Sequence, residues 1–219
     1  MIQHSTLIFF LSGFFFIAGC TTTRLEEQNN LPFEILEGES VVITSNSYHV
    51  GNETETDFLQ CINKSLIKKQ KTFNVIPTQQ FINQLYPWFE PRTAPQTTDD
   101  LSSFLARDLV REKIETLDVK YFINISGQTK TNASSGALTC AAGPGGGGCF
   151  GLAWWDDTSS YSASIWDLSE EASVGNVSAS VSGTSVIPAL VIPIPILART
   201  QKTACEELTD QILDFFSRN

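Results

Sequence analysis

The chain of 219 residues carries 24 acidic and 14 basic side chains, which gives a formal net charge of −10. A length of this order suits one domain, and the 42% hydrophobic content supplies enough apolar side chains for a core. The acidic balance argues against nucleic acid as a partner, because phosphate binding needs clustered Lys and Arg. Histidine occurs only as His4 and His49, which argues against imidazole metal sites and against His-based catalysis.

An apolar run from Leu7 to Ile17 opens the chain. A helix that spans a bilayer needs about 20 apolar residues, so this shorter run predicts the core of a signal peptide. Ile17-Ala18-Gly19-Cys20 follows and resembles the lipobox of bacterial lipoproteins, in which a branched or Leu-like residue and two small residues precede Cys. The alternative is an ordinary cleaved signal, or a buried helix, with Cys20 present by chance.

The lipobox resemblance implies a lipoprotein signal peptide over residues 1–19, cleavage before Cys20, and lipidation of that thiol with diacylglycerol and acyl chains such as palmitate. Two or more chains anchor a protein stably, since each buried methylene contributes about 0.8 kcal/mol. Thr21 stands where inner-membrane retention signals typically have Asp, which favours the periplasmic face of the cell outer membrane as the location.

Four cysteines remain after Cys20, an even number that predicts two disulfide bonds in an exported chain. Three pairings are possible. Cys140 and Cys149 flank a Gly-rich turn, which favours a local bridge, and Cys61 and Cys205 lie on the apolar stripes of two predicted helices. Reduced thiols and a zinc site are the alternatives; the lack of any C-x-x-C spacing argues against metal, and no cofactor is predicted.

Residues 20–38 lack periodicity and predict the lipidated Cys and a tether. Residues 39–219 predict one periplasmic α/β domain with a Gly-rich insertion at 131–151. Thr54 and Asp57 match a capping box at the start of its first helix. Periodicity of two predicts strands at 39–45, 73–76, 119–126, 161–168 and 174–182, and periodicity of 3.6 predicts helices at 54–69, 79–85, 99–117 and 203–216.

This order of elements predicts an α/β (α+β) fold, a single two-layer domain with a mixed, mostly antiparallel sheet and helices packed on one face. The segments Leu117 to Thr129 (LDVKYFINISGQT) and Tyr161 to Gly183 (YSASIWDLSEEASVGNVSASVSG) resemble strands of curli-secretion-type lipoproteins. Penicillin-binding-protein activators and the N-terminal domain of the Tol-system propeller protein share the pattern. The resemblance covers roughly residues 39–183 plus the closing helix, and it implies a non-catalytic interaction domain. The Gly-rich insertion and the segment 186–197 depart from the family pattern.

Three segments are candidate sites. Phe150, Trp154 and Trp155 form the densest aromatic patch and are partner-binding candidates, with a core or sheet-covering role as the alternative. The adjacent Asp156 and Asp157 predict a hairpin turn rather than an acid–base pair. Val186 to Leu197 (VIPALVIPIPIL) is apolar but rich in Pro, so it predicts either a buried extended connection or an exposed docking segment.

The sequence therefore predicts an outer-membrane-anchored periplasmic lipoprotein that is not an enzyme. It would act as an envelope adaptor or accessory protein through protein–protein contacts, with the membrane bound through the lipid. The alternatives are an oligomeric subunit of a secretion assembly and, less favoured, an envelope hydrolase that uses His49.

Overall fold

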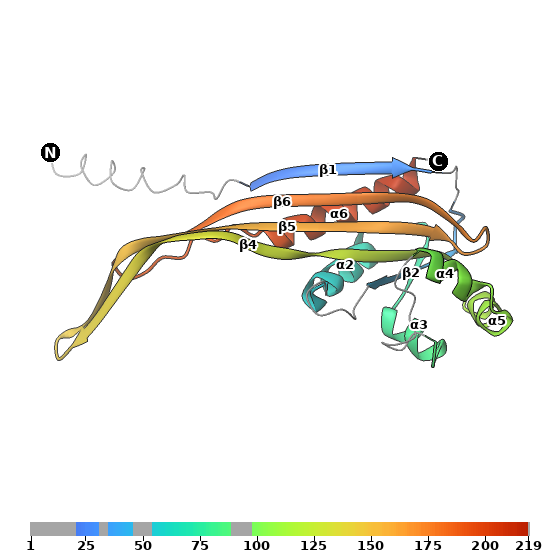
Figure 1. The fold of residues 1–219 in the computed structure, drawn as a ribbon, viewed down its shortest axis with the longest axis horizontal. Helices are drawn as coiled ribbons and strands as arrows, with labels where there is room; N and C mark the ends of the chain where they lie inside the picture. Colours follow the sequence, from blue (N-terminus) through green and yellow to red (C-terminus); the bar gives the residue numbers. More distant parts are fainter. Residues whose placement is uncertain (1–20, 31–34, 46–53, 89–97, 219) are drawn as a thin grey trace, which may run out of the picture. The chain divides into compact units, whose positions relative to one another are not determined.

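The computed structural model describes residues 21–30, 35–45, 54–88 and 98–218. The predicted signal peptide at 1–19, Cys20 and His49 lie outside the described residues. The elements, shown in Figure 1, are β1 (Thr21–Asn29), β2 (Ser40–Ser45), α2 (Thr56–Lys69), β3 (Asn74–Ile76), α3 (Thr78–Gln84), α4 (Thr98–Leu105), α5 (Asp108–Thr116), β4 (Val119–Gly143), β5 (Gly146–Asp167), β6 (Ala172–Val191) and α6 (Thr200–Ser217).

One sheet contains all six of these strands, in the order β1-β6-β5-β4-β2-β3. β2 runs parallel to both β3 and β4. β4, β5 and β6 follow one another through short turns, which makes each pair antiparallel. The prediction of a mixed, mostly antiparallel sheet with helices is therefore confirmed.

The helices pack on two faces of the sheet rather than on one. Alternate residues of β2 show why: Val41 and Ile43 belong to the larger core cluster with α2 and α6, whereas Val42 belongs to a second cluster with α3, α4 and α5. Successive strand residues point to opposite faces, so the two clusters lie on opposite sides of the sheet. The prediction that helices pack on one face is therefore correct for α2 and α6 only. Helices α3, α4 and α5 cover the other face, because Val42 and Phe122 make it apolar as well.

The α2 helix buries Phe58, Ile62 and Leu66, which recur every four residues and form one face of the helix. The predicted capping box at its start is wrong. Glu55 is the N-cap and makes no side-chain capping hydrogen bond, while the Thr54 hydroxyl donates to the carbonyl of Ile125 at 3.5 Å. The Thr54 side chain thus connects the start of α2 to the sheet instead of capping the helix.

Residues 21–29 form the edge strand β1, not the first part of a flexible tether. Asn30 continues the pairing, because its amide donates to the carbonyl of Val174 on β6 at 2.9 Å. Nearly every residue of β1 is exposed. The sequence therefore carries no apolar alternation that would have marked a strand here, and backbone pairing with β6 supplies the structure.

The chain divides into two compact units. Among the described residues, unit 1 comprises 21–22, 130–158 and 182–200, and unit 2 comprises 23–30, 35–45, 54–88, 98–129, 159–181 and 201–218. Strands β4, β5 and β6 contribute residues to both units. Both core clusters lie in unit 2, and the Gly-rich segment 131–151 lies in unit 1.

Candidate functional site

The Gly-rich segment of unit 1 is a β-hairpin. β4 continues to Gly143 and β5 begins at Gly146, so that only Pro144 and Gly145 form the turn. The sequence favoured a hairpin connection held by a Cys140–Cys149 bridge, and the structure confirms it, with the two strands continuing through most of the Gly-rich segment. The disulfide between Cys140 and Cys149 joins the two strands, with 4.0 Å between their Cα atoms.

Asp156 and Asp157 lie within β5, so the predicted hairpin turn at these residues is wrong. Their side chains point to opposite faces and accept hydrogen bonds from different neighbouring strands. Thr184 of β6 donates to Asp156 at 2.5 Å, and Thr131 of β4 donates to Asp157 at 2.6 Å. These bonds explain how two adjacent carboxylates fit into a strand, and they fix which residues of β5 and β6 share a face.

An apolar face of the unit 1 sheet follows from this register. On β5, Phe150, Leu152 and Trp154 share the face of Asp156, because they lie two residues apart. The residues of β6 that share the face of Thr184 continue it, and the bridge between Val186 and Ile196 extends it to the segment that folds back along β6. We call this set the apolar face: Phe150, Leu152, Trp154, Val186, Pro188, Leu190, Ile192, Ile194 and Ile196.

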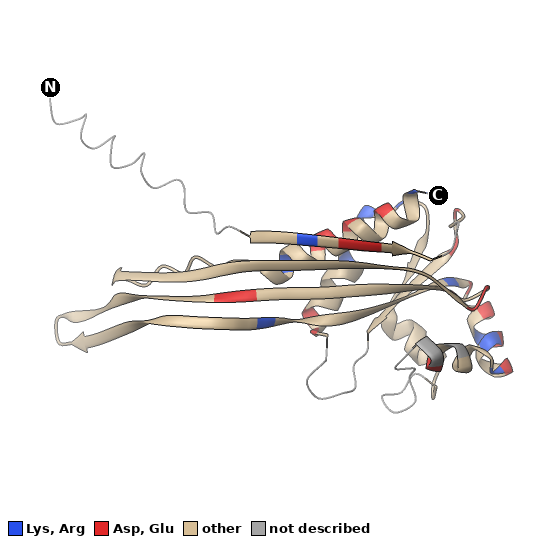
Figure 2. Cartoon of the chain, turned by 45° about the horizontal axis from the view of Figure 1, so that its top comes forward, with Lys and Arg blue, Asp and Glu red and all other residues tan. Residues whose placement is uncertain are grey.

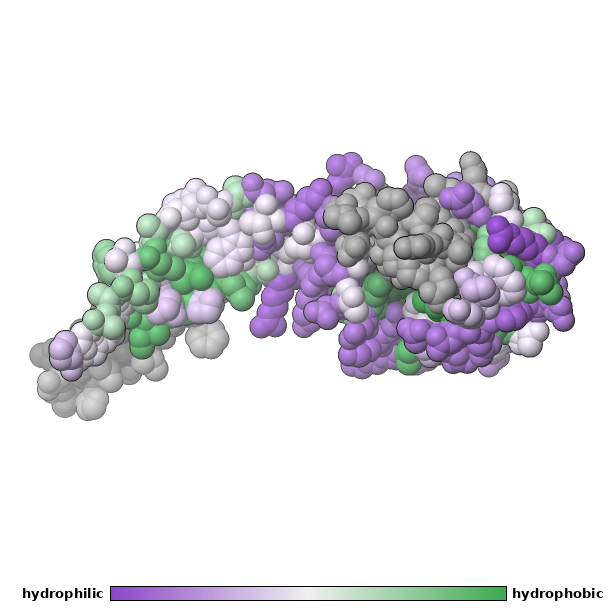
Figure 3. All heavy atoms as spheres, turned by 60° about the horizontal axis from the view of Figure 1, so that its bottom comes forward, coloured by the Kyte–Doolittle hydropathy of each residue, from purple (hydrophilic) through white to green (hydrophobic). Residues whose placement is uncertain are grey.

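The side chains of the apolar face are exposed to an unusual degree. Phe150 is 71% exposed, Leu190 is 80% exposed and Ile192 is 71% exposed. Eight of the thirteen exposed large hydrophobic residues in the described chain belong to unit 1. The space-filling view shows hydrophobic residues gathered over this part of the chain (Figure 3). Because contiguous exposed apolar patches mark interaction sites, this face is the candidate functional site.

Charge is confined to the ends of the segments that build unit 1. Within 130–158 and 182–200 the charged residues are Lys130, Asp156, Asp157 and Arg199, and each lies within two residues of a segment end. Residues 131–155 and 182–198 contain none. Figure 2 shows this as long uncharged stretches of β4, β5 and β6, whereas the helices carry many charged residues.

The segment Val186–Leu197, whose role the sequence left open, is mostly exposed and not a buried connection. It ends β6 and then folds back to pair with it. The Ile196 amide donates to the Val186 carbonyl at 2.8 Å, the Val186 amide donates to the Ile196 carbonyl at 2.8 Å, and the Ile194 amide donates to the Pro188 carbonyl at 3.0 Å. Pro193 and Pro195 alternate with these donors, which is why a segment so rich in Pro still pairs.

The structure brings the aromatic candidates together with residues of Val186–Leu197, a segment that the sequence singled out separately. Phe150 and Trp154 are exposed on the apolar face, and Trp154 is 41% exposed. Trp155 points the other way, is half-buried, and donates its indole N–H to Asp157 at 2.9 Å. The spacing Phe150-x-Leu152-x-Trp154 was the signal for the face, but the contribution of Leu190 and Ile192 depends on strand register and leaves no local pattern.

The second disulfide lies in the core of unit 2. Cys61 of α2 and Cys205 of α6 are bonded, with 6.3 Å between their Cα atoms. Both disulfides are the pairs that the sequence favoured among three possible pairings. The Cys61–Cys205 bond joins the two helices that cover one face of the sheet.

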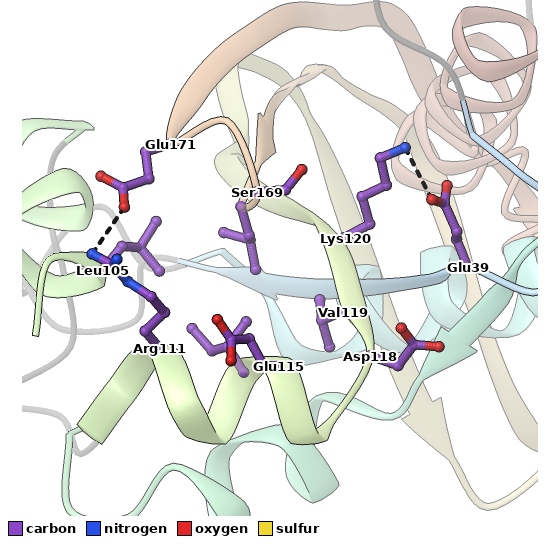
Figure 4. A pocket seen from close by; sticks show the side chains of 11 residues that line it. Glu39, Leu105, Arg111, Glu115, Asp118, Val119, Lys120, Ser169 and Glu171 are labelled. Carbon is purple, nitrogen blue, oxygen red and sulfur yellow. Dashed lines mark ion pairs between the residues drawn. The ribbon is translucent and has the colours of Figure 1, made fainter. Parts of the chain in front are cut away.

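A cavity of about 620 Å³ opens in unit 2 at the start of β4 (Figure 4). Lys120 pairs with Glu39 at 2.9 Å and Arg111 pairs with Glu171 at 3.2 Å. Glu115 and Asp118 also line the cavity, so its carboxylates outnumber its cations. The arrangement holds ion pairs, and the Ser169 hydroxyl at its lining donates to the Asp167 carboxylate, which also accepts from the Ser169 amide.

A polar cluster surrounds the hydroxyl of Tyr161, which is buried in unit 2. The hydroxyl donates to Glu55 at 2.8 Å and lies 2.9 Å from the Thr129 hydroxyl, while Gln201 donates to it at 3.4 Å. Burial, with a smaller contribution from Glu55, raises the pKa of Tyr161 to about 12. The phenol therefore stays protonated at neutral pH and serves as a structural donor.

Among the described residues, no group of His, Cys, Asp and Glu is placed to hold a metal ion. None of the described helices combines the length and the apolar composition that crossing a bilayer requires. The exposed apolar face of unit 1 thus remains the feature of the described chain that most needs a function.

The sequence matches no protein-family model and no curated protein. Two solved structures of PelC from Paraburkholderia phytofirmans resemble the chain in structure. A substituted PelC dodecamer gives a TM-score of 0.41 and 11% identity over 91% of this chain and 100% of that chain. The PelC dodecamer gives a TM-score of 0.43 and 10% identity over 90% of this chain and 100% of that chain. Scores this low support no conclusion about function or assembly.

Proposed function

We propose that this chain is an outer-membrane-anchored periplasmic lipoprotein that acts without catalysis, as an adaptor or accessory protein of the envelope. It holds to the membrane through lipid on Cys20 and works through protein–protein contacts. The lipobox-like sequence before Thr21 supports the anchor. The apolar face of unit 1 supports a binding role at the envelope, because folding leaves most of its side chains exposed.

The polar groups of the described chain support binding rather than turnover. Asp156 and Asp157 point to opposite faces, so they do not form an acid–base pair. Tyr161 is buried with a raised pKa, which is the opposite of an activated nucleophile. The cations of the unit 2 cavity are held by carboxylates.

The anchor is tested with the full chain and its Cys20→Ala variant, expressed in a Gram-negative host fed with radiolabelled palmitate. The parent chain is expected to take up label and to enter the detergent phase of a Triton X-114 extraction. The Cys20→Ala variant is expected to take up no label. The matched control is Cys140→Ala with Cys149→Ala, which removes two cysteines outside the lipobox and should keep the label. Equal labelling of parent and Cys20→Ala chains contradicts the anchor.

The adaptor role is tested in intact cells with a photo-crosslinking residue at exposed apolar positions of each unit. Phe150 and Leu190 serve in unit 1, and Tyr86 and Leu109 serve in unit 2. An adaptor is expected to give a reproducible protein adduct from at least one position, identified by mass spectrometry and lost with Cys20→Ala. Chains that give no protein adduct from any position would rule out the adaptor role.

A further inference from the structure

We propose that the apolar face of unit 1 lies against the same membrane that holds Cys20, with its side chains in the acyl region of the lipid. This inference rests on the proposed anchoring and deepens it. The lipid on Cys20 is then one of two membrane contacts, and the second is made by the folded sheet itself.

The residue that follows the proposed anchor point belongs to the same compact unit as the apolar face. Thr21 is the residue after Cys20, and a Cβ added at Gly183 of β6 would lie 3.1 Å from its methyl group. Gly183 precedes Val186, the first apolar-face residue of β6, by three residues, or about 10 Å of strand. A lipid attached to Cys20 therefore enters the bilayer close to the apolar face, and the covalent anchor holds this face near the membrane.

The composition of the face favours lipid over a protein partner. Its nine members include no charged or hydrogen-bonding side chain except the indole of Trp154, and most are Ile, Leu or Val. These side chains, with Phe, are the ones that enter hydrocarbon favourably. Protein interfaces are enriched in Arg and Met as well as in aromatic residues and have a polar rim with about one hydrogen bond per 100–200 Å², whereas this face has two aromatic residues but no Arg and no Met.

The border of the face has the composition of a membrane interface. Trp154 ends the apolar series on β5, and Trp155, Asp156 and Asp157 follow directly. Trp is enriched at the level of the lipid headgroups, where one end of the ring is apolar and the other meets water. On the return segment, Arg199 follows the last apolar residues in the same way. On both segments, charged residues thus follow directly after the border of the apolar face.

The backbone of the most apolar segment is also prepared for lipid. Hydrocarbon offers no hydrogen bonds, so exposed amides are costly there. The amides of Val186, Ile194 and Ile196 all donate within unit 1, at 2.8, 3.0 and 2.8 Å. An interfacial depth of about 5–10 Å would cover the side chains of the face while the sheet edges still reach water.

The test uses the mature chain from residue 20 with Cys20→Ser, which carries no lipid, and vesicles of phosphatidylethanolamine and phosphatidylglycerol at 3:1. The chain is expected to float with the vesicles. A face variant with Phe150→Ser, Leu152→Ser, Leu190→Ser and Ile192→Ser is expected to bind at least tenfold less. The matched control, Ile67→Ser with Leu109→Ser, removes exposed apolar residues of unit 2 and should bind like the parent.

A second readout reports depth. Lipids brominated on their acyl chains should quench the fluorescence of bound protein, and Trp154→Phe should remove most of that quenching. Parent chain that stays in the dense fractions overturns the proposal. The proposal is also overturned if the parent chain is a dimer that does not bind vesicles and the face variant is a monomer, because the apolar face then contacts a second copy of the chain. Absence of palmitate labelling of the parent chain in cells would refute the lipid anchor alone, because the Cys20→Ser chain is expected to bind vesicles without lipid.

Discussion

Tyr161 on β5 donates its hydroxyl proton to the Glu55 carboxylate at the start of α2, over 2.8 Å. Glu55 also accepts from the amide of Thr129 on β4 at 2.7 Å. The ring of Tyr161 stacks on Phe58 one turn further along α2, with 3.4 Å between ring centroids. One tyrosine thus joins the first core helix to two strands through both its ring and its hydroxyl.

Tyr161→Phe should keep the stacking on Phe58 and remove the hydrogen bond to Glu55. A buried hydrogen bond to a charged group contributes about 1.5–3 kcal/mol, so the free energy of unfolding should fall by that amount. Urea denaturation followed by circular dichroism measures it. Tyr86→Phe is the control, because Tyr86 is 64% exposed and its substitution should change stability little. Equal stability of the two variants would show that the cluster around Tyr161 contributes nothing.

The same residue predicts how stability depends on alkaline pH. Burial raises the pKa of Tyr161 from 10.0 to about 12, so the folded chain favours the protonated phenol more than the unfolded chain does. Its contribution is fully present below pH 10 and is lost as the pH rises through 12. The difference in stability between the parent and Tyr161→Phe should therefore shrink over this range. Absorbance at 295 nm should show one fewer tyrosine titrating near pH 12 in the variant; a difference in stability that grows with pH contradicts the assignment.

The two disulfides should differ in their contribution to stability. Cys61 and Cys205 are 144 residues apart in sequence, whereas Cys140 and Cys149 are 9 apart. A disulfide that closes a longer loop lowers the entropy of the unfolded chain more and so stabilises the folded chain more. Replacing the first pair by Ala should therefore lower the free energy of unfolding by about 5 kcal/mol, and replacing the second pair should lower it by about 2.5 kcal/mol. Urea unfolding of both double variants under oxidising conditions compares them. A larger loss for the hairpin pair would contradict the argument from chain entropy.

Parts of the fold with strong apolar periodicity could be predicted from the sequence. Helix α6 is an example, because Leu208 and Ile212 recur on the face that the structure buries. Strand β1 and the outer parts of β4 and β5 could not, because their side chains are exposed or small and the pairing of backbones holds them. Local sequence patterns report burial, and these segments bury little.

The same limit applies to the candidate site. Phe150 and Trp154 could be predicted as a contact surface because aromatic residues stand out in the sequence. Ile192 could not be assigned to the same face, because its position depends on how the segment after β6 folds back. Pro193 and Pro195 argued against a strand, yet their missing amides fall between the residues that donate to β6.

Gly127 marks a point where β4 and β5 approach too closely for any side chain. Its φ is +138°, and an added Cβ would collide with the carbonyl oxygen of Ser160. Gly127→Ala should therefore destabilise the chain by at least about 1–3 kcal/mol, the cost of holding a non-Gly residue in such a conformation. Gly145→Ala in the hairpin turn is the control, because nothing lies within 4 Å of its added Cβ. Melting temperatures compare the two, and equal values would contradict the close approach.

Two isoleucines distinguish side chains that hold the fold from side chains that the fold leaves exposed. Ile212 of α6 is 0% exposed within the larger core cluster, whereas Ile192 of the apolar face is 71% exposed. Ile212→Ala should cost about 2–5 kcal/mol, because it removes buried methylene groups and leaves a cavity. Ile192→Ala should change stability by less than about 0.5 kcal/mol in either direction. Urea denaturation of the unlipidated mature chain, without vesicles, measures both. A large loss for Ile192→Ala would mean that the apolar face is already buried in the free protein, and the proposed membrane contact would lose its basis.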